Sequence, residues 1–149
     1  MTSEVEHKND LNTPQLPASI QLSIEYLPIA ALIAEGRKLK LHKAADITAL
    51  AQAIEVFGFL VPVLIDQDSK IISGNGRLEA ARKLGLSDVP CIRIRHLSSD
   101  QLRVFRIAEN QLGQLAGWDT EALGLELQDL SNIDLGFSLE VTGLSSARI

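Results

Sequence analysis

The amino-acid sequence predicts a compact α+β domain, with a small mixed sheet flanked by helices and a helical C-terminal extension. Short apolar runs typical of strands alternate with longer segments of helical period, and the changes follow one another closely along the chain. The 149 residues fit one domain. Hydrophobic residues make up 46% of the chain and aromatic residues only 4%, so we expect an aliphatic core.

The N-terminal part is predicted to contain a tail, a strand and a helix. Residues 1–20 are polar and contain two prolines, so we expect them to be disordered. Residues 20–27 alternate weakly between apolar and polar side chains, as in an edge strand that ends at Pro28. The next helix has Asp46 as its expected N-cap and ends at Gly58. Its apolar stripe consists of Ile47, Leu50, Ala51, Ile54 and Phe57.

The middle of the chain is predicted to form a hairpin, a helix and a further core strand. Residues 61–65 and 70–72 are short apolar runs separated by a polar turn, which indicates two paired strands. A helix is expected over residues 75–84, and Gly85 is its expected stop. Residues 89–95 alternate again and are predicted to lie in the core of the sheet.

Two helices are predicted in the C-terminal part. The first covers residues 100–115, with Ser98 or Ser99 as its N-cap. The second is capped by Asp119, and Trp118 is expected to seal it onto the core as a hydrophobic staple. The side chains expected to face inward are Leu102, Phe105, Leu112 and Leu115 in the first helix, and Leu123, Leu127 and Leu130 in the second.

The predicted organisation is a tail over residues 1–20, a domain over residues 21–116, and a helical extension and tail over residues 117–149. Cys91 is the one cysteine of the sequence, which excludes a disulfide framework and indicates a reducing compartment. It lies in a predicted core strand, as an inert buried thiol would. No apolar run approaches the roughly 18–20 residues that span a bilayer, so we expect a cytoplasmic protein without membrane contact.

Charge is distributed unevenly along the chain. The net charge of −5 argues against strong non-specific binding to nucleic acid. Residues 70–106 carry eight cations and three acids, whereas residues 109–140 carry seven acids and no Lys or Arg. This pattern predicts one face for an anion and another face for a different partner; the alternative is a solvated surface of mixed charge.

The segment Ser73-Gly74-Asn75-Gly76-Arg77 joins a predicted strand to a predicted helix and has the features of a phosphate site. Its two glycines let the backbone approach a ligand closely. The helix start directs free N–H groups and a partial positive charge outward, and the arginine adds a bidentate donor. The spacing is neither that of a Walker loop nor that of a Rossmann fingerprint. Taken alone, the motif also fits a tight turn with an exposed arginine.

Together with its neighbours, this loop resembles the ParB N-terminal domain family, which has a ParB/sulfiredoxin-like fold. That family's loop reads Gly-Glu-Arg-Arg with an alanine three residues on; Gly74, Arg77 and Ala80 are kept here, and Asn75 and Gly76 replace the family's Glu and first Arg. A closer resemblance is to a branch with Gly-x-Gly-Arg-Leu-Glu-Ala-Ala, found ahead of phage- and plasmid-type DNA methyltransferases. The resemblance covers roughly residues 22–145, and its other motifs are residues 57–59, 62–65, 84–86, 89–90, 107–112, 116–119 and 137–143.

The resemblance implies a CTP switch. The family's loop holds the triphosphate, and its Glu-Asn pair binds Mg²⁺, a cation that prefers hard oxygen ligands and bridges to phosphates. An upstream basic segment of the family falls on residues 38–42. The implied phosphate-binding residues are Ser73, Gly74, Asn75, Gly76, Arg77, Lys40 and His42, and the implied Mg²⁺ ligands are Glu109 and Asn110. The alternatives are a helical surface pair at residues 109–110 and a solvated basic loop at residues 38–42.

The implied function is a ParB-like nucleotide- or phosphate-binding regulatory module associated with DNA modification or partition. Its implied partners are a nucleoside triphosphate, DNA reached directly or through a protein such as a DNA methyltransferase, and a second copy in a homodimer. Any activity of such a switch would be slow nucleotide hydrolysis. Two alternatives stay open: a small phosphotransferase or nuclease on the same fold, and a non-catalytic protein–protein adaptor. Asn75 stands where sulfiredoxin has its catalytic cysteine, which excludes a sulfinic-acid reductase.

Overall fold

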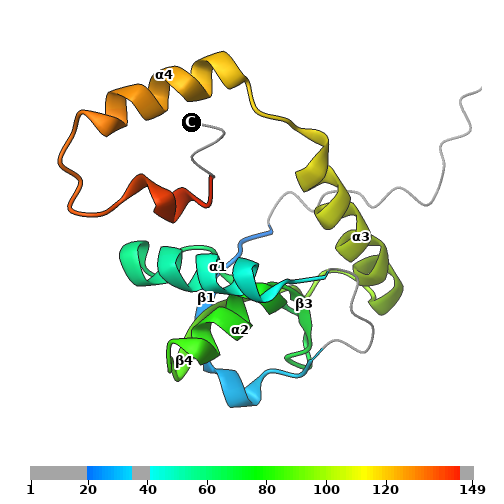
Figure 1. Cartoon of the computed structure of the whole chain (residues 1–149). Coiled ribbons are helices and arrows are strands. Elements are labelled where there is room, and N and C mark those ends of the chain that lie inside the picture. The colour runs from blue at the N-terminus through cyan, green and yellow to red at the C-terminus, as the bar shows by residue number, and fades with distance from the viewer. Residues whose placement is uncertain (1–19, 35–40, 145–149) are drawn as a thin grey trace, which may run out of the picture.

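The computed structural model describes residues 20–34 and 41–144, and it shows a mixed sheet with helices on both faces (Figure 1). The strands are β1 (Ile24–Pro28), β2 (Val63–Ile65), β3 (Ile71–Ser73) and β4 (Asp88–Arg93). The helices are α1 (Ala44–Phe57), α2 (Asn75–Lys83), α3 (Ser99–Leu115) and α4 (Thr120–Ser131), with two 3-10 turns, η1 (Ile29–Ala31) and η2 (Leu139–Thr142). The predicted α+β class with a small mixed sheet and a helical C-terminal extension is confirmed. The predicted tail lies outside the described residues, except for Ile20.

The sheet has the strand order β1-β4-β2-β3. β4 is antiparallel to β1, with Ile24 opposite Ile92, and parallel to β2, with Val63 opposite Cys91. β2 and β3 form the predicted antiparallel hairpin. β1 lies at the edge, as its weak alternation predicted, and β4 lies inside the sheet, as expected for a core strand.

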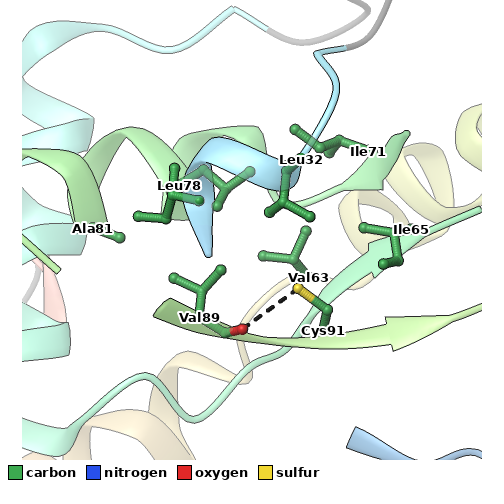
Figure 2. Packing of buried hydrophobic residues seen from close by; sticks show 9 residues of the cluster. Leu32, Val63, Ile65, Ile71, Leu78, Ala81, Val89 and Cys91 are labelled. Carbon is green, nitrogen blue, oxygen red and sulfur yellow. Dashed lines mark hydrogen bonds between the residues drawn. The ribbon is translucent and has the colours of Figure 1, made fainter. Parts of the chain in front are cut away.

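The main core fills the space between one face of the sheet and α2 (Figure 2). Leu78 and Ala81 of α2 pack against Val63, Val89 and Cys91 of the strands, and all five are almost completely buried. Aliphatic residues fill this core, as the composition predicted. Cys91 is completely buried, as the sequence predicted, and burial raises the pKa of its thiol, which disfavours the reactive thiolate. The complete set is Ile29, Leu32, Val63, Ile65, Ile71, Leu78, Ala81, Val89 and Cys91.

The second face of the sheet is covered in part by α3. Leu102 and the half-buried Phe105 pack there against Ile72 and Ile94, as the apolar stripe predicted. Leu112 and Leu115 were expected to face inward as well, but both are more than 60% exposed. The reason is that the apolar cluster between α3 and the sheet involves only the first two turns of α3, so the later apolar side chains have no part in it.

The predicted helix caps are observed, except that α1 begins earlier than expected. The Ser98 hydroxyl accepts the Gln101 N–H, and the Asp119 carboxylate accepts the Ala122 N–H, so both residues are the N-caps that the sequence predicted. Helix α1 begins two residues before Asp46, and the Asp46 carboxylate instead accepts the backbone N–H of Lys43 from the helix interior. Gly58, with a φ of 88°, ends α1 as expected.

The C-terminal extension returns to the body of the domain through η2. This turn packs against α1, where Phe137 meets Phe57 edge to face with a centroid distance of 5.4 Å. Trp118, the expected staple of α4, is instead 66% exposed. It belongs to the linker between α3 and α4. None of the helices within residues 20–34 and 41–144 is long and apolar enough to cross a membrane.

Candidate phosphate-binding site

The loop between β3 and α2 places a bare helix start beside a cavity. Gly74 is the N-cap of α2 and has a φ of +114°, a conformation that residues with a side chain rarely adopt. No side chain of the described residues caps this helix end. The N–H groups of the first turn have no partner within the helix. They and the positive end of the helix dipole are therefore available to an anion.

Three separate segments of the chain line this cavity, which has a volume of about 180 Å³. They are the segment from His42 into α1, the end of β3 with the start of α2, and the middle of α3. The lining residues are His42, Leu50, Ile72, Ser73, Gly74, Asn75, Gly76, Arg77, Glu109 and Asn110. Every residue that the resemblance assigned to the site lies here, except Lys40, which is outside the described residues. Leu50 and Ile72 were not foreseen as lining residues, because their apolar periodicity marked them only as core positions.

Arg77 lies in the first turn of α2, half-buried beside the cavity. Its Nη2 donates to the Pro62 carbonyl at 3.2 Å, whereas its Nε is buried without a hydrogen-bond partner among the described residues. Burial lowers the pKa of the guanidinium, and the negative charge of Glu109 acts in the opposite direction. An arginine nevertheless stays charged in proteins. The site therefore contains a cation whose donors are only partly used.

Glu109 and Asn110 come from the neighbouring helix α3. The Ser73 hydroxyl donates to Oε2 of Glu109 at 3.3 Å, and this bond joins residues that lie 36 positions apart. The Asn110 amide nitrogen donates to the Arg106 carbonyl, so its side-chain oxygen is the atom left for a cation. No group of three or more His, Cys, Asp or Glu within the described residues could hold a metal. The pair fits Mg²⁺ if phosphate and water complete the coordination, as is usual for that ion.

His42 packs directly against Gly76. A Cβ added to Gly76 would lie 2.8 Å from Cε1 and 3.0 Å from Nδ1 of the imidazole, closer than real Cβ contacts. Gly76 therefore makes room for the His42 ring at the start of the helix. The family resemblance had marked this position as a departure, and the structure gives the substitution a steric reason.

We expect Gly76→Ala to displace the His42 ring with a loss of stability of only about 1 kcal/mol, because that ring can move while the helix keeps its φ and ψ. The imidazole signals of His42 in NMR spectra should shift. Gly113→Ala is the control, since a Cβ added there meets no described atom within 4 Å beyond its chain neighbours and the backbone of its own helix. Unchanged His42 signals in Gly76→Ala would show that the ring does not rest on Gly76.

This combination defines a class of protein: a small α+β domain that presents a helix N-terminus, an arginine and a carboxylate–amide pair to one cavity. Comparison with known proteins gives the family. The model of the ParB N-terminal domain matches residues 16–111, and the chain belongs to that family.

Two relatives and one solved structure show how far the similarity extends. The ParB-like nuclease domain-containing protein YnaK of Escherichia coli (strain K12) is 35% identical over 83 residues, which are 56% of this chain and 95% of YnaK. A probable plasmid-partitioning protein ParB of Thermus thermophilus is 34% identical over 122 residues, 79% of this chain but 39% of that protein. A truncated Caulobacter crescentus ParB complexed with CTP-γ-S is 24% identical, with a TM-score of 0.63 over 74% of this chain and 63% of that one. The chain thus spans well under two thirds of the Thermus partition protein.

Proposed function

We propose that this chain is a ParB-type regulatory module that binds a nucleoside triphosphate with Mg²⁺ and passes the bound state to DNA or to a partner protein. The observation that supports it most strongly is the cavity itself, where residues 73–77 and the pair Glu109–Asn110 line one space. A cytoplasmic location, a homodimer and a DNA methyltransferase as partner belong to the same proposal.

Each part of the site has a distinct chemical task in this proposal. The first-turn N–H groups of α2 would bind phosphate oxygens, and Arg77 would add a charge-assisted contact. Glu109 and Asn110 would hold Mg²⁺, which supplies positive charge between the protein and the phosphates. The Caulobacter ParB solved with CTP-γ-S has this fold, which makes CTP the first nucleotide to test. Partition is the role in the name of the Thermus relative, which supports a DNA-associated function.

A protein–protein adaptor is the second candidate, and exposed apolar side chains favour it. α3 and the segment after it expose large apolar side chains that would suit a protein interface. They are Val104, Ile107, Leu112, Leu115, Trp118 and Leu125. A pure adaptor would need no nucleotide, so a binding measurement separates the two candidates.

Calorimetric titration with CTP, ATP and GTP, each with and without Mg²⁺, tests the proposed function. We expect Mg²⁺-dependent binding of at least one nucleotide. Arg77→Ala should weaken it by a factor of about 10–100, since a hydrogen bond to a charged group contributes about 1.5–3 kcal/mol. The same samples, incubated and analysed for nucleoside diphosphate, would show whether the chain hydrolyses what it binds.

Arg82→Ala is the matched control for this titration. Arg82 lies in the last turn of the same helix, is exposed, and does not line the cavity. Its loss changes the net charge as much as that of Arg77, but we expect the affinity to change less than twofold. A folded wild-type chain that binds none of the three nucleotides would refute the proposal and favour the adaptor.

A further inference from the structure

The carboxylate of Glu109 places a negative charge beside the loop of residues 73–77. Its carboxylate accepts a hydrogen bond from Ser73, the residue immediately before the N-cap of α2. It also lines the same cavity as residues 74–77 and acts electrostatically on Arg77. The carboxylate thus accepts a hydrogen bond from the hydroxyl, and acts on the charge of the guanidinium, that a phosphate group would use.

A phosphate group at α2 would have to share this space with a second negative charge. Two like charges a few ångströms apart repel each other, and the protein surroundings weaken this repulsion less than bulk water does. Within the described residues, only Arg77 among the lining residues is a permanent cation. The positive charge among these lining residues is therefore too small to balance an oligophosphate, which brings several negative charges.

We propose that Glu109 acts as an internal anion that opposes phosphate binding at residues 73–77 until a divalent cation neutralises it. This inference rests on the proposed function and adds its regulation. It assigns Glu109 two opposite effects: the carboxylate repels phosphate when no cation is present and attracts the cation–phosphate complex when one is. Binding would then be strongest with both ligands present, and phosphate without the cation would bind only weakly.

The replacement Glu109→Gln separates these two effects. Glutamine has nearly the same shape and keeps an oxygen that can accept the Ser73 hydrogen bond, but it has no charge. In EDTA, we expect the variant to bind inorganic tripolyphosphate about tenfold more tightly than the wild type, a difference of about 1.4 kcal/mol. A larger gain is not expected, because the Glu109 side chain is exposed and solvent screens its charge.

The second readout is the effect of Mg²⁺. Addition of Mg²⁺ should strengthen tripolyphosphate binding by the wild-type chain, whereas Glu109→Gln should lose most of that gain. Glu79→Gln is the control: it removes one negative charge from α2, but Glu79 is exposed and does not line the cavity. Calorimetry of the full chain at low ionic strength, where charge effects are largest, measures all three proteins.

The possible results distinguish this inference from the proposed function. Tighter binding by Glu109→Gln in EDTA, absent in Glu79→Gln, would support the internal anion. If the wild type binds in Mg²⁺ and depends on Arg77 while Glu109→Gln gains nothing in EDTA, the internal anion is refuted and the proposed function stands. An equal gain in Glu79→Gln would also refute it, because the effect would then come from net charge. Absence of binding by every protein in every condition would refute both.

Discussion

Replacing Leu78 with alanine is expected to lower the free energy of unfolding by about 3 kcal/mol, within the range measured for buried leucines. Leu78 is 1% exposed and packs in the main core, in the cluster with Val63 and Val89 (Figure 2). The loss has two parts: the transfer free energy of the removed methyl groups and the cavity that they leave. The surrounding aliphatic side chains and backbone are held by the sheet, so this cavity can close only partly.

Urea unfolding followed by circular dichroism measures this effect, with Leu60→Ala as the control. Leu60 is 74% exposed, and its truncation should change the free energy of unfolding by less than about 0.5 kcal/mol. Equal effects of the two substitutions would mean that the core is not packed around Leu78. The result also bears on the site, because Leu78 follows Arg77 directly and its N–H donates to the Gly74 carbonyl at 3.0 Å.

The sequence predicts the local elements of this fold well, because each carries its own signal. Ser98 and Asp119 are small polar residues before apolar periodic segments, and both cap helices in the structure. Gly58 and Gly85 end helices with positive φ, a conformation that glycine adopts easily. Hydrogen bonds and steric limits between near neighbours decide these features, so they can be predicted without the rest of the chain.

The direction in which α3 points could not be predicted in the same way. Its apolar residues continue past Phe105 to Leu112 and Leu115, and periodicity alone assigned the later ones to the core. In the structure, the sheet supports only the beginning of this helix, and the later residues are exposed. An apolar stripe shows that a side chain favours a partner, but it does not show whether the domain itself supplies one.

The candidate site could be predicted only in part, because local patterns do not show which distant segments of the chain meet. The loop 73–77 has the composition of an anion site, which is a local property. Its proximity to Glu109 depends on how α3 crosses the sheet, and only the resemblance to the ParB N-terminal domain family suggested it. The resemblance also placed Gly76 and His42 at one site, but their direct contact could not be predicted from local patterns, because it depends on a distance between segments 34 positions apart.

Gly74→Ala is expected to affect both stability and phosphate binding. With a φ of +114° at this position, an alanine should lower the free energy of unfolding by about 2–3 kcal/mol. The added Cβ would also lie 3.2 Å from Cγ2 of Val63 and 3.2 Å from Nη2 of Arg77. Val63 is fully buried and cannot move away easily, so Arg77 should yield and lose its contact with the Pro62 carbonyl. We expect nucleotide affinity to fall at least about tenfold as a result.

Gly85→Ala provides the comparison that separates backbone strain from the loss of the site. Gly85 has a φ of +74° at the other end of α2, and a Cβ added there meets no described atom within 4 Å apart from its chain neighbours. Its replacement should lower the free energy of unfolding by only about 1–2 kcal/mol and leave nucleotide affinity unchanged. Chemical unfolding and calorimetry of both variants would test this. Equal losses of affinity would mean that α2 must be rigid as a whole, whereas a loss confined to Gly74→Ala would locate the requirement at the backbone beside Arg77.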